Sequence, residues 1–197
     1  LTPAAGSVLS LLTVLFLGLT TLLLVFDLEK PSRFLYILTR PQWRSWLTRG
    51  AFFLIGFSLL ASLWAAAEVA TYFNWQGVGL LESAREGLFL AGIPLAIMAA
   101  IYTAFLFGQA EGRDFWQSPL LPVHLLIQAL LMGCAAVLLL SGTDLIPAEL
   151  LGITRWSFAF LILLDAFAIL SGEFAMPHAS DSAAKAAHAI SHGKYKI

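Results

Sequence analysis

The sequence predicts an all-α protein, a polytopic transmembrane helix bundle with five spans. Hydrophobic residues make up 59% of the chain and charged residues 12%, whereas about a quarter of an ordinary soluble domain is charged. The apolar residues form five runs, each near the roughly 20 residues that a helix needs to cross the hydrocarbon. None of the runs alternates as a barrel strand does, and backbone groups in lipid must be paired internally, so helices are the predicted spans.

The predicted spans follow one another without an internal repeat. They are Gly6–Phe26, Gly50–Phe73, Gly87–Gly108, Pro122–Ser141 and Trp156–Met176. Residues 1–176 are therefore expected to form the helical bundle, and residues 177–197 a cytoplasmic connector and tail.

The third span carries two features that bear on packing. Gly92, Ala96 and Ala100 recur at four-residue spacing, and such a stripe of small residues lets another helix approach closely. Pro94 lies in the same run and is expected to bend the helix. A tight bundle with one bent member is predicted.

The cations of the loops set the predicted orientation. Most follow the first span or lie in the tail: Lys30, Arg33, Arg40, Arg44, Arg49, Lys185, Lys194 and Lys196. The opposite loops offer Arg85 and Arg155, so the positive-inside rule puts the N-terminus outside and the C-terminus inside a bacterial cytoplasmic membrane. An outside start without a secretory leader leads us to expect a fragment that lacks an upstream helix.

The loop between the first two spans is expected to lie at the membrane interface. Its apolar residues interleave with arginines, and Pro41 would divide it into two short amphipathic helices; these residues are Phe34, Leu35, Leu38, Trp43, Trp46 and Leu47. Two roles stay open for it. It either anchors the chain at the headgroups or docks a cytoplasmic partner.

Charge, cysteine content and motifs exclude several functions. A net charge of −1 argues against a nucleic-acid partner, which would need clustered cations. Cys134 is the single cysteine and His124 the single histidine of the spans, so no iron-sulfur cluster, zinc ion or pair of haems is expected in this chain. The motifs of nucleophilic hydrolases and phosphate loops are absent as well.

A buried acid in the second span is the first candidate site. Trp64, Glu68 and Tyr72 follow at four-residue steps and therefore share one helix face. Acids inside a span are costly and usually functional, and this face could bind and protonate the head of a lipophilic ring. The alternative is that the aromatic residues belong to the interfacial belt and Glu68 bonds a neighbouring helix.

The fifth span carries a second candidate, half of a proton path. Asp165 is expected near mid-membrane, with Glu173 about 12 Å further along the same face, a gap that water could bridge. His124 opens the fourth span on the cytoplasmic side. Glu173 could instead be a solvated end charge, and Arg155 could either fix a quinone carbonyl or anchor the helix at the interface.

Two loop passages carry more specific patterns. One runs Asp27-Leu28-Glu29-Lys30-Pro31-Ser32-Arg33-Phe34 and is followed by Arg40-Pro41, Trp46 and Gly50; the other runs Gly112-Arg113-Asp114-Phe115-Trp116-Gln117-Ser118-Pro119-Leu120-Leu121-Pro122 and leads to Gly133. Both resemble signatures of the NrfD/PsrC family of membrane subunits, and Pro177-His178 with its Ala-rich tail resembles that family's connector. Asp165 lies where the family often has an acid, whereas Glu29, Lys30 and His124 depart from its pattern.

The resemblance implies a haem-free integral subunit of a respiratory oxidoreductase complex. Such subunits pass electrons between the pool of menaquinone or ubiquinone and an iron-sulfur subunit, which serves a catalytic subunit holding molybdopterin or haems, as in polysulfide reductase, nitrite reductase and alternative complex III. In this chain we expect Trp64, Glu68, Tyr72 and Arg155 to bind the quinone and Asp165, Glu173 and His124 to conduct protons. Glu68 would exchange the proton and Tyr72 would hydrogen-bond the ring oxygen.

Two other functions stay open from the residues alone. A secondary transporter or proton-translocating channel also keeps acids at mid-membrane, although it would show broken helices in matching halves. A purely structural membrane anchor would need no quinone site. A co-purifying iron-sulfur protein with bound quinone would discriminate between these functions.

Overall fold

The structure, a computed structural model, describes residues 2–27, 34–75, 79–109 and 118–172, together with residues 185 and 188. All regular structure in these residues is helical, and five of their helices are long and apolar enough to cross a membrane. The predicted all-α bundle with five spans is thus confirmed. Most of the predicted tail, from Pro177 on, lies outside the described residues.

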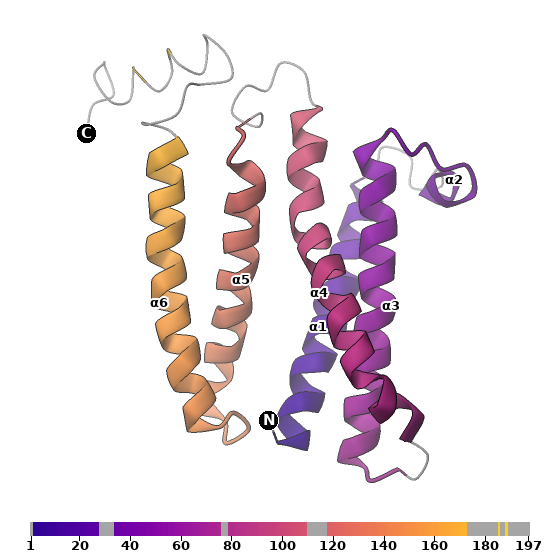
Figure 1. The fold of residues 1–197 in the computed structure, drawn as a ribbon, viewed down its shortest axis with the longest axis vertical. Coiled ribbons are helices and arrows are strands. Elements are labelled where there is room, and N and C mark those ends of the chain that lie inside the picture. Colours follow the sequence, from indigo (N-terminus) through magenta and orange to yellow (C-terminus); the bar gives the residue numbers. More distant parts are fainter. Residues whose placement is uncertain are drawn as a thin grey trace.

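The spanning helices stand side by side, and one short helix lies at the end of the bundle (Figure 1). In chain order the helices are α1 (Pro3–Phe26), α2 (Phe34–Thr39), α3 (Trp46–Tyr72), α4 (Gly79–Gly108), α5 (Leu121–Leu139), the 3-10 turn η3 (Leu140–Gly142) and α6 (Ala148–Leu170). We call the end where α3 and α5 begin the α2 end. Glu68 and Arg85 lie toward the opposite end, and His124 lies near the α2 end.

The helix starts follow ordinary capping chemistry. Thr2 caps α1 by accepting a hydrogen bond from the backbone N–H of Ala5, and Pro3 occupies the first turn, where its missing N–H costs nothing. Pro122 takes the equivalent place in α5, and Pro147 precedes α6. These residues define the ends of the helices more sharply than the apolar runs do.

Three helices begin at least one turn earlier than their apolar runs. α3, α4 and α6 begin at Trp46, Gly79 and Ala148, ahead of the predicted starts. The reason is that a helix does not stop where its charges begin, since long cationic side chains reach polar surroundings from within a helix. Arg85 and Arg155 consequently lie inside helices, not in the loops to which we assigned them.

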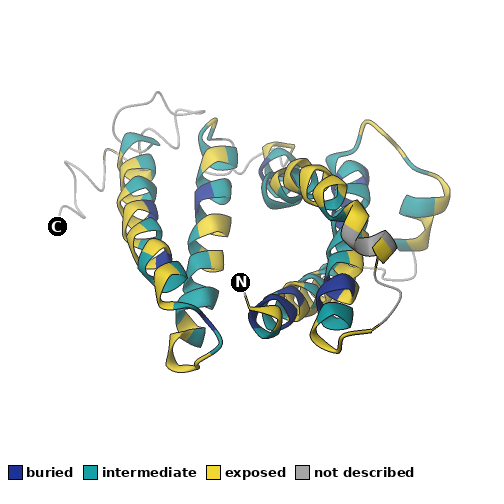
Figure 2. Cartoon of the chain, turned by 60° about the horizontal axis from the view of Figure 1, so that its bottom comes forward, coloured by how far each residue is buried: buried dark blue, intermediate teal, exposed yellow. Residues whose placement is uncertain are grey.

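The bundle consists of a group of three helices and a hairpin. α3 packs against both α1 and α4, and α5 packs against α6. Figure 2 shows the two groups side by side, the hairpin on the left and the three-helix group on the right. The main packing between the groups is that of α4 against α5.

α3 and α4 approach each other closely at Gly50. A Cβ at Gly50 would overlap the ring of Tyr102, which is buried against it. The predicted stripe of small residues makes no such close contact at Gly92, where an added Cβ would meet nothing within 4 Å. Pro94 lies inside α4, and Figure 1 shows this helix changing direction along its length, as predicted.

The segment around α2 has both exposed and partly buried apolar side chains. Leu35 and Tyr36 are 66% and 60% exposed. Trp46 stacks on Phe105 of α4 with ring centroids 4.3 Å apart, and the guanidinium of Arg49 lies 4.8 Å from the Trp46 ring centroid. The expected second interfacial helix is the first turn of α3 itself. Anchoring and docking both remain predictions for this segment.

Candidate functional site

Glu68 is a buried acid held from three sides. It lies near the end of α3 and is 8% exposed. Its Oε1 forms an ion pair with Nη2 of Arg85 on α4. On α1, the carboxylate lies against Gly6, and the hydroxyl of Ser7 donates a hydrogen bond to the Glu68 carbonyl oxygen at 3.0 Å. The side chain is therefore fixed where α1, α3 and α4 meet.

The positive charge of Arg85 offsets the electrostatic cost of burying the Glu68 carboxylate. A carboxylate in a low-dielectric site needs a partner of opposite charge, and removal of Arg85 would leave the buried charge of Glu68 uncompensated. The guanidinium also lies 5.4 Å from the centroid of the Trp64 ring, within the range of a cation–π contact. Nε of Arg85 is buried and has no hydrogen-bond partner among the described residues.

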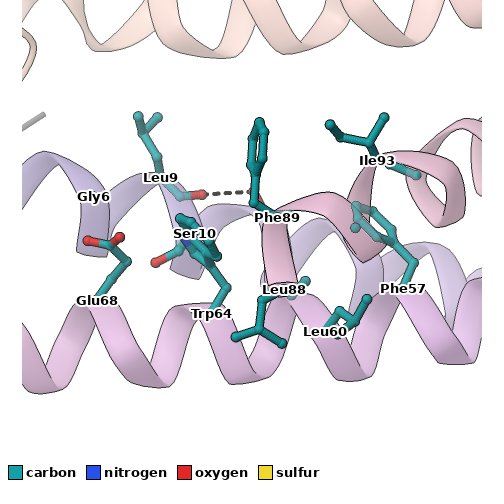
Figure 3. Close-up of a pocket in the computed structure, with 14 residues that line it drawn as sticks. Gly6, Leu9, Ser10, Phe57, Leu60, Trp64, Glu68, Leu88, Phe89 and Ile93 are labelled. Atoms are coloured by element: carbon teal, nitrogen blue, oxygen red, sulfur yellow. Dashed lines mark hydrogen bonds between the residues drawn. The ribbon is translucent and has the colours of Figure 1, made fainter. Parts of the chain in front are cut away.

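A cavity of about 350 Å³ opens beside Glu68 between α1, α3 and α4, and Figure 3 shows its lining. The lining is mostly apolar, with a few polar groups; it consists of Gly6, Leu9, Ser10, Thr13, Phe57, Leu60, Ala61, Trp64, Glu68, Leu88, Phe89, Gly92, Ile93 and Ala96. Small-molecule sites have this character and a volume from roughly 300 Å³ upward. The cavity suits an apolar ring with a polar substituent.

The structure brings some of the predicted quinone-binding residues together and separates others. Trp64 and Glu68 both line the cavity. Tyr72 lies one turn beyond it, is 50% exposed and packs edge-on against Phe73. Arg155 lies exposed within α6 and outside the cavity lining. Two of the four predicted residues therefore share this cavity.

His124 and Asp165 form a second polar pair, between α5 and α6. Nδ1 of His124 and Oδ1 of Asp165 are 2.9 Å apart. Both atoms are buried, and neither has an aligned hydrogen bond within the part of the chain that the structure describes. Asp165 lies in the second half of α6, which runs from Ala148 to Leu170, and its depth in the membrane stays a prediction. Glu173 lies outside the described residues.

Sequence reasoning missed the partner of Glu68. Arg85 was assigned to a loop beside a helix mouth, because its charge was taken to end the apolar run. A usable signal was present, since Glu68 lies near the end of α3 and Arg85 near the start of α4, at similar distances along the chain from the short connection between them. Two residues at similar distances from a short connection lie at about the same level along the axes of the two antiparallel helices that it joins. Gly6 had no comparable signal, because the long connection after α1 leaves the register open.

The described residues contain no group of three or more histidine, cysteine, aspartate or glutamate side chains placed to hold a metal ion. Cys134 is partly exposed and unbonded. The predicted absence of haem and clusters remains a prediction for the chain as a whole.

The fold and the site define a multi-pass membrane protein with an acid-lined cavity between its helices. The profile of the polysulphide reductase, NrfD family matches residues 5–190, and the chain belongs to this family. Its members are membrane subunits of quinone-interacting oxidoreductase complexes and typically assemble with iron-sulfur and catalytic subunits. No curated protein and no solved structure gave a significant match. The resemblance drawn from the two loop passages is confirmed.

Proposed function

We propose that this chain binds quinone or quinol in the cavity beside Glu68 and exchanges electrons with an iron-sulfur partner subunit. The observation that carries the proposal is a buried acid opening onto an apolar cavity between three spanning helices. Family membership supports quinone as the ligand. Molybdopterin or haems would then belong to a catalytic subunit beyond the iron-sulfur partner.

The residues of the cavity fit the chemistry of a quinone. Phe57, Leu60 and Ile93 are among the apolar side chains of its wall and offer packing for a ring. Glu68 supplies a proton acceptor or donor for one ring oxygen, and Trp64 adds an indole to the same wall. Tyr72 and Arg155 do not line the cavity and are left out of the proposed site.

Glu68 is the group to which we assign the proton. Quinol oxidation releases two protons and two electrons, so the site needs a base next to a ring oxygen. The Glu68 carboxylate would accept one proton while the electrons pass to the iron-sulfur subunit, and Arg85 would hold the carboxylate in place. Quinone reduction would use the same contacts in reverse.

The pair of His124 and Asp165 supports a further part of the proposal, proton exchange near the α2 end. Histidine and carboxylate side chains are the usual groups of proton transfer, and these two lie 2.9 Å apart. The arginines near this end, Arg40, Arg44 and Arg49, favour a cytoplasmic location by the positive-inside rule. We accordingly place the α2 end inside, in a bacterial cytoplasmic membrane.

The test replaces the acid without changing its shape. In the intact complex, Glu68→Gln should slow quinone-linked turnover by about 10²-fold or more, the typical contribution of a positioned acid or base. Glu149→Gln, an exposed glutamate at the start of α6, is the matched control and should keep full turnover. Unchanged turnover of Glu68→Gln in a fully assembled complex would refute the proposed site.

A further inference from the structure

A second hollow adjoins the cavity on the side of Arg85. It measures about 390 Å³ and is lined by Trp64, Arg85, Glu86, Phe89 and Leu90. Trp64 and Phe89 line the cavity as well, and their ring centroids are 6.5 Å apart. These two side chains therefore form a shared wall, and Arg85 extends from the second hollow to the carboxylate of Glu68.

Among the described residues, the other sides of Glu68 offer no second charged side chain. Toward α1 the carboxylate meets Gly6, which has no side chain, and the nearby hydroxyl of Ser7 already donates to the Glu68 backbone and to the Pro3 carbonyl oxygen. Toward the cavity the wall is mostly apolar. Among the side chains that the structure describes, the charged neighbours of Glu68 lead through Arg85 to Glu86.

We propose that the hollow of Arg85 and Glu86 is the route by which the proton passes between Glu68 and water. This inference rests on the proposed function, and it adds the side of Glu68 from which protons arrive and leave. Glu86 is exposed and lines the hollow, whereas Glu68 is buried and is linked to the hollow by its ion pair with Arg85. The ligand and the proton then use opposite sides of the wall formed by Trp64 and Phe89.

The proton balance is simple. Oxidation of one quinol breaks two O–H bonds and sends two electrons to the iron-sulfur partner; the proton of one hydroxyl passes to water, and the other proton forms an O–H bond on the Glu68 carboxylate. Glu68 then releases this proton to water in the second hollow, from which it reaches the Glu86 carboxylate and the bulk. Quinone reduction draws a proton along the same path in the opposite direction.

Arg85 is a positioning residue in this route. Arginine side chains do not exchange their charge in proteins, so Arg85 is not the group that carries the proton. It holds the Glu68 carboxylate at the wall, and its side chain is 35% exposed on the other side. Its buried Nε has no hydrogen-bond partner among the described residues. The hollow measures about 390 Å³, and Arg85 and Glu86 are the groups of its lining to which water would bond.

The experiment compares two glutamates in the intact complex. Glu86→Gln removes the solvated carboxylate from the route, and Glu149→Gln serves as the exposed control. Glu86→Gln should lower kcat about tenfold, leave KM for the quinol unchanged and increase the solvent deuterium isotope effect. Added acetate should restore part of the rate, because a diffusible carboxylate can replace the missing one. A merely structural role of Glu86 would show neither the isotope effect nor the rescue.

The result for Glu68→Gln separates this inference from the proposed function. If that variant loses turnover while Glu86→Gln keeps the wild-type kcat and isotope effect, the quinone site stands and the route is refuted. If Glu68→Gln has no effect, the proposed function fails first. Arg85→Lys provides a second check on the route: it keeps the charge and should retain more activity than Arg85→Gln, and equal activities would contradict a positioning role.

Discussion

Gly6 of α1 lies directly against the carboxylate of Glu68 of α3. A Cβ built at Gly6 would come within 2.9 Å of the Glu68 Cδ and closer still to Oε2. The absence of a side chain at position 6 is thus what lets a charged group lie between these two helices, next to the ion pair with Arg85.

Gly6→Ala should therefore displace the acid. We expect a loss of roughly 1–3 kcal/mol in stability, the usual cost of overpacking, together with slower quinone turnover. Gly18→Ala in the same helix is the control, since a Cβ there meets nothing within 4 Å. Thermal unfolding of the purified complex and its turnover measure both effects, and equal behaviour of the two variants would contradict the contact.

Gly50→Ala should loosen the packing of α3 against α4. The added methyl group would overlap the buried ring of Tyr102, which must shift at a cost of roughly 1–3 kcal/mol. Because the contact lies at the α2 end, away from the cavity, KM for the quinol should stay unchanged. A lower midpoint of thermal unfolding with normal KM is the expected result, and an unchanged midpoint would argue against this close approach.

Gly92→Leu should fill the cavity without straining the fold. Gly92 lines the cavity, and the position of its Cβ is open, so the new side chain takes space from the ligand. A few added methylene groups are worth roughly 1–3 kcal/mol in such a pocket, so KM for the quinol should rise about tenfold or more. Gly133→Leu on α5 is the control, being exposed and uncrowded. A normal KM in both variants would place the quinone elsewhere.

His124 and Asp165 should behave as a coupled pair. Asp165→Asn and His124→Gln each leave one buried partner unmatched, so the double variant should lose less stability than the sum of the two single losses. Contacting polar residues of this kind show coupling energies of roughly 0.5–3 kcal/mol. A double-mutant cycle on thermal unfolding measures the coupling energy. A value near zero would mean that the two side chains do not interact.

The number and type of spans could be predicted because hydrophobic length is a strong signal. The boundaries could not, since the apolar run ends where charge begins and the helix does not. Arg85 is an example of the error that a misplaced helix boundary causes. Assigned to a loop, it had no partner, whereas inside α4 it lies level with Glu68.

The contacts between neighbouring antiparallel helices can be predicted from how far each residue lies, along the sequence, from the connection between the two helices. Gly50 and Tyr102 are almost equally far from the centre of the connection between α3 and α4, and His124 and Asp165 are so placed about the connection between α5 and α6. Short connections thus allow register to be predicted. The cavity could not be predicted in this way, because it needs the register of α1, which a long segment joins to α3.

The bend in α4 at Pro94 has a mechanical consequence. α4 touches α3 on one flank and α5 on the other, and its proline leaves the helix short of one internal hydrogen bond. A change in the angle between its two halves would tilt Arg85 relative to Glu68 and at the same time shift the surface on which the hairpin of His124 and Asp165 rests. A structural change at Glu68 would in this way alter the packing around Asp165 at the opposite end of the bundle, although no contact between described side chains joins the two acids.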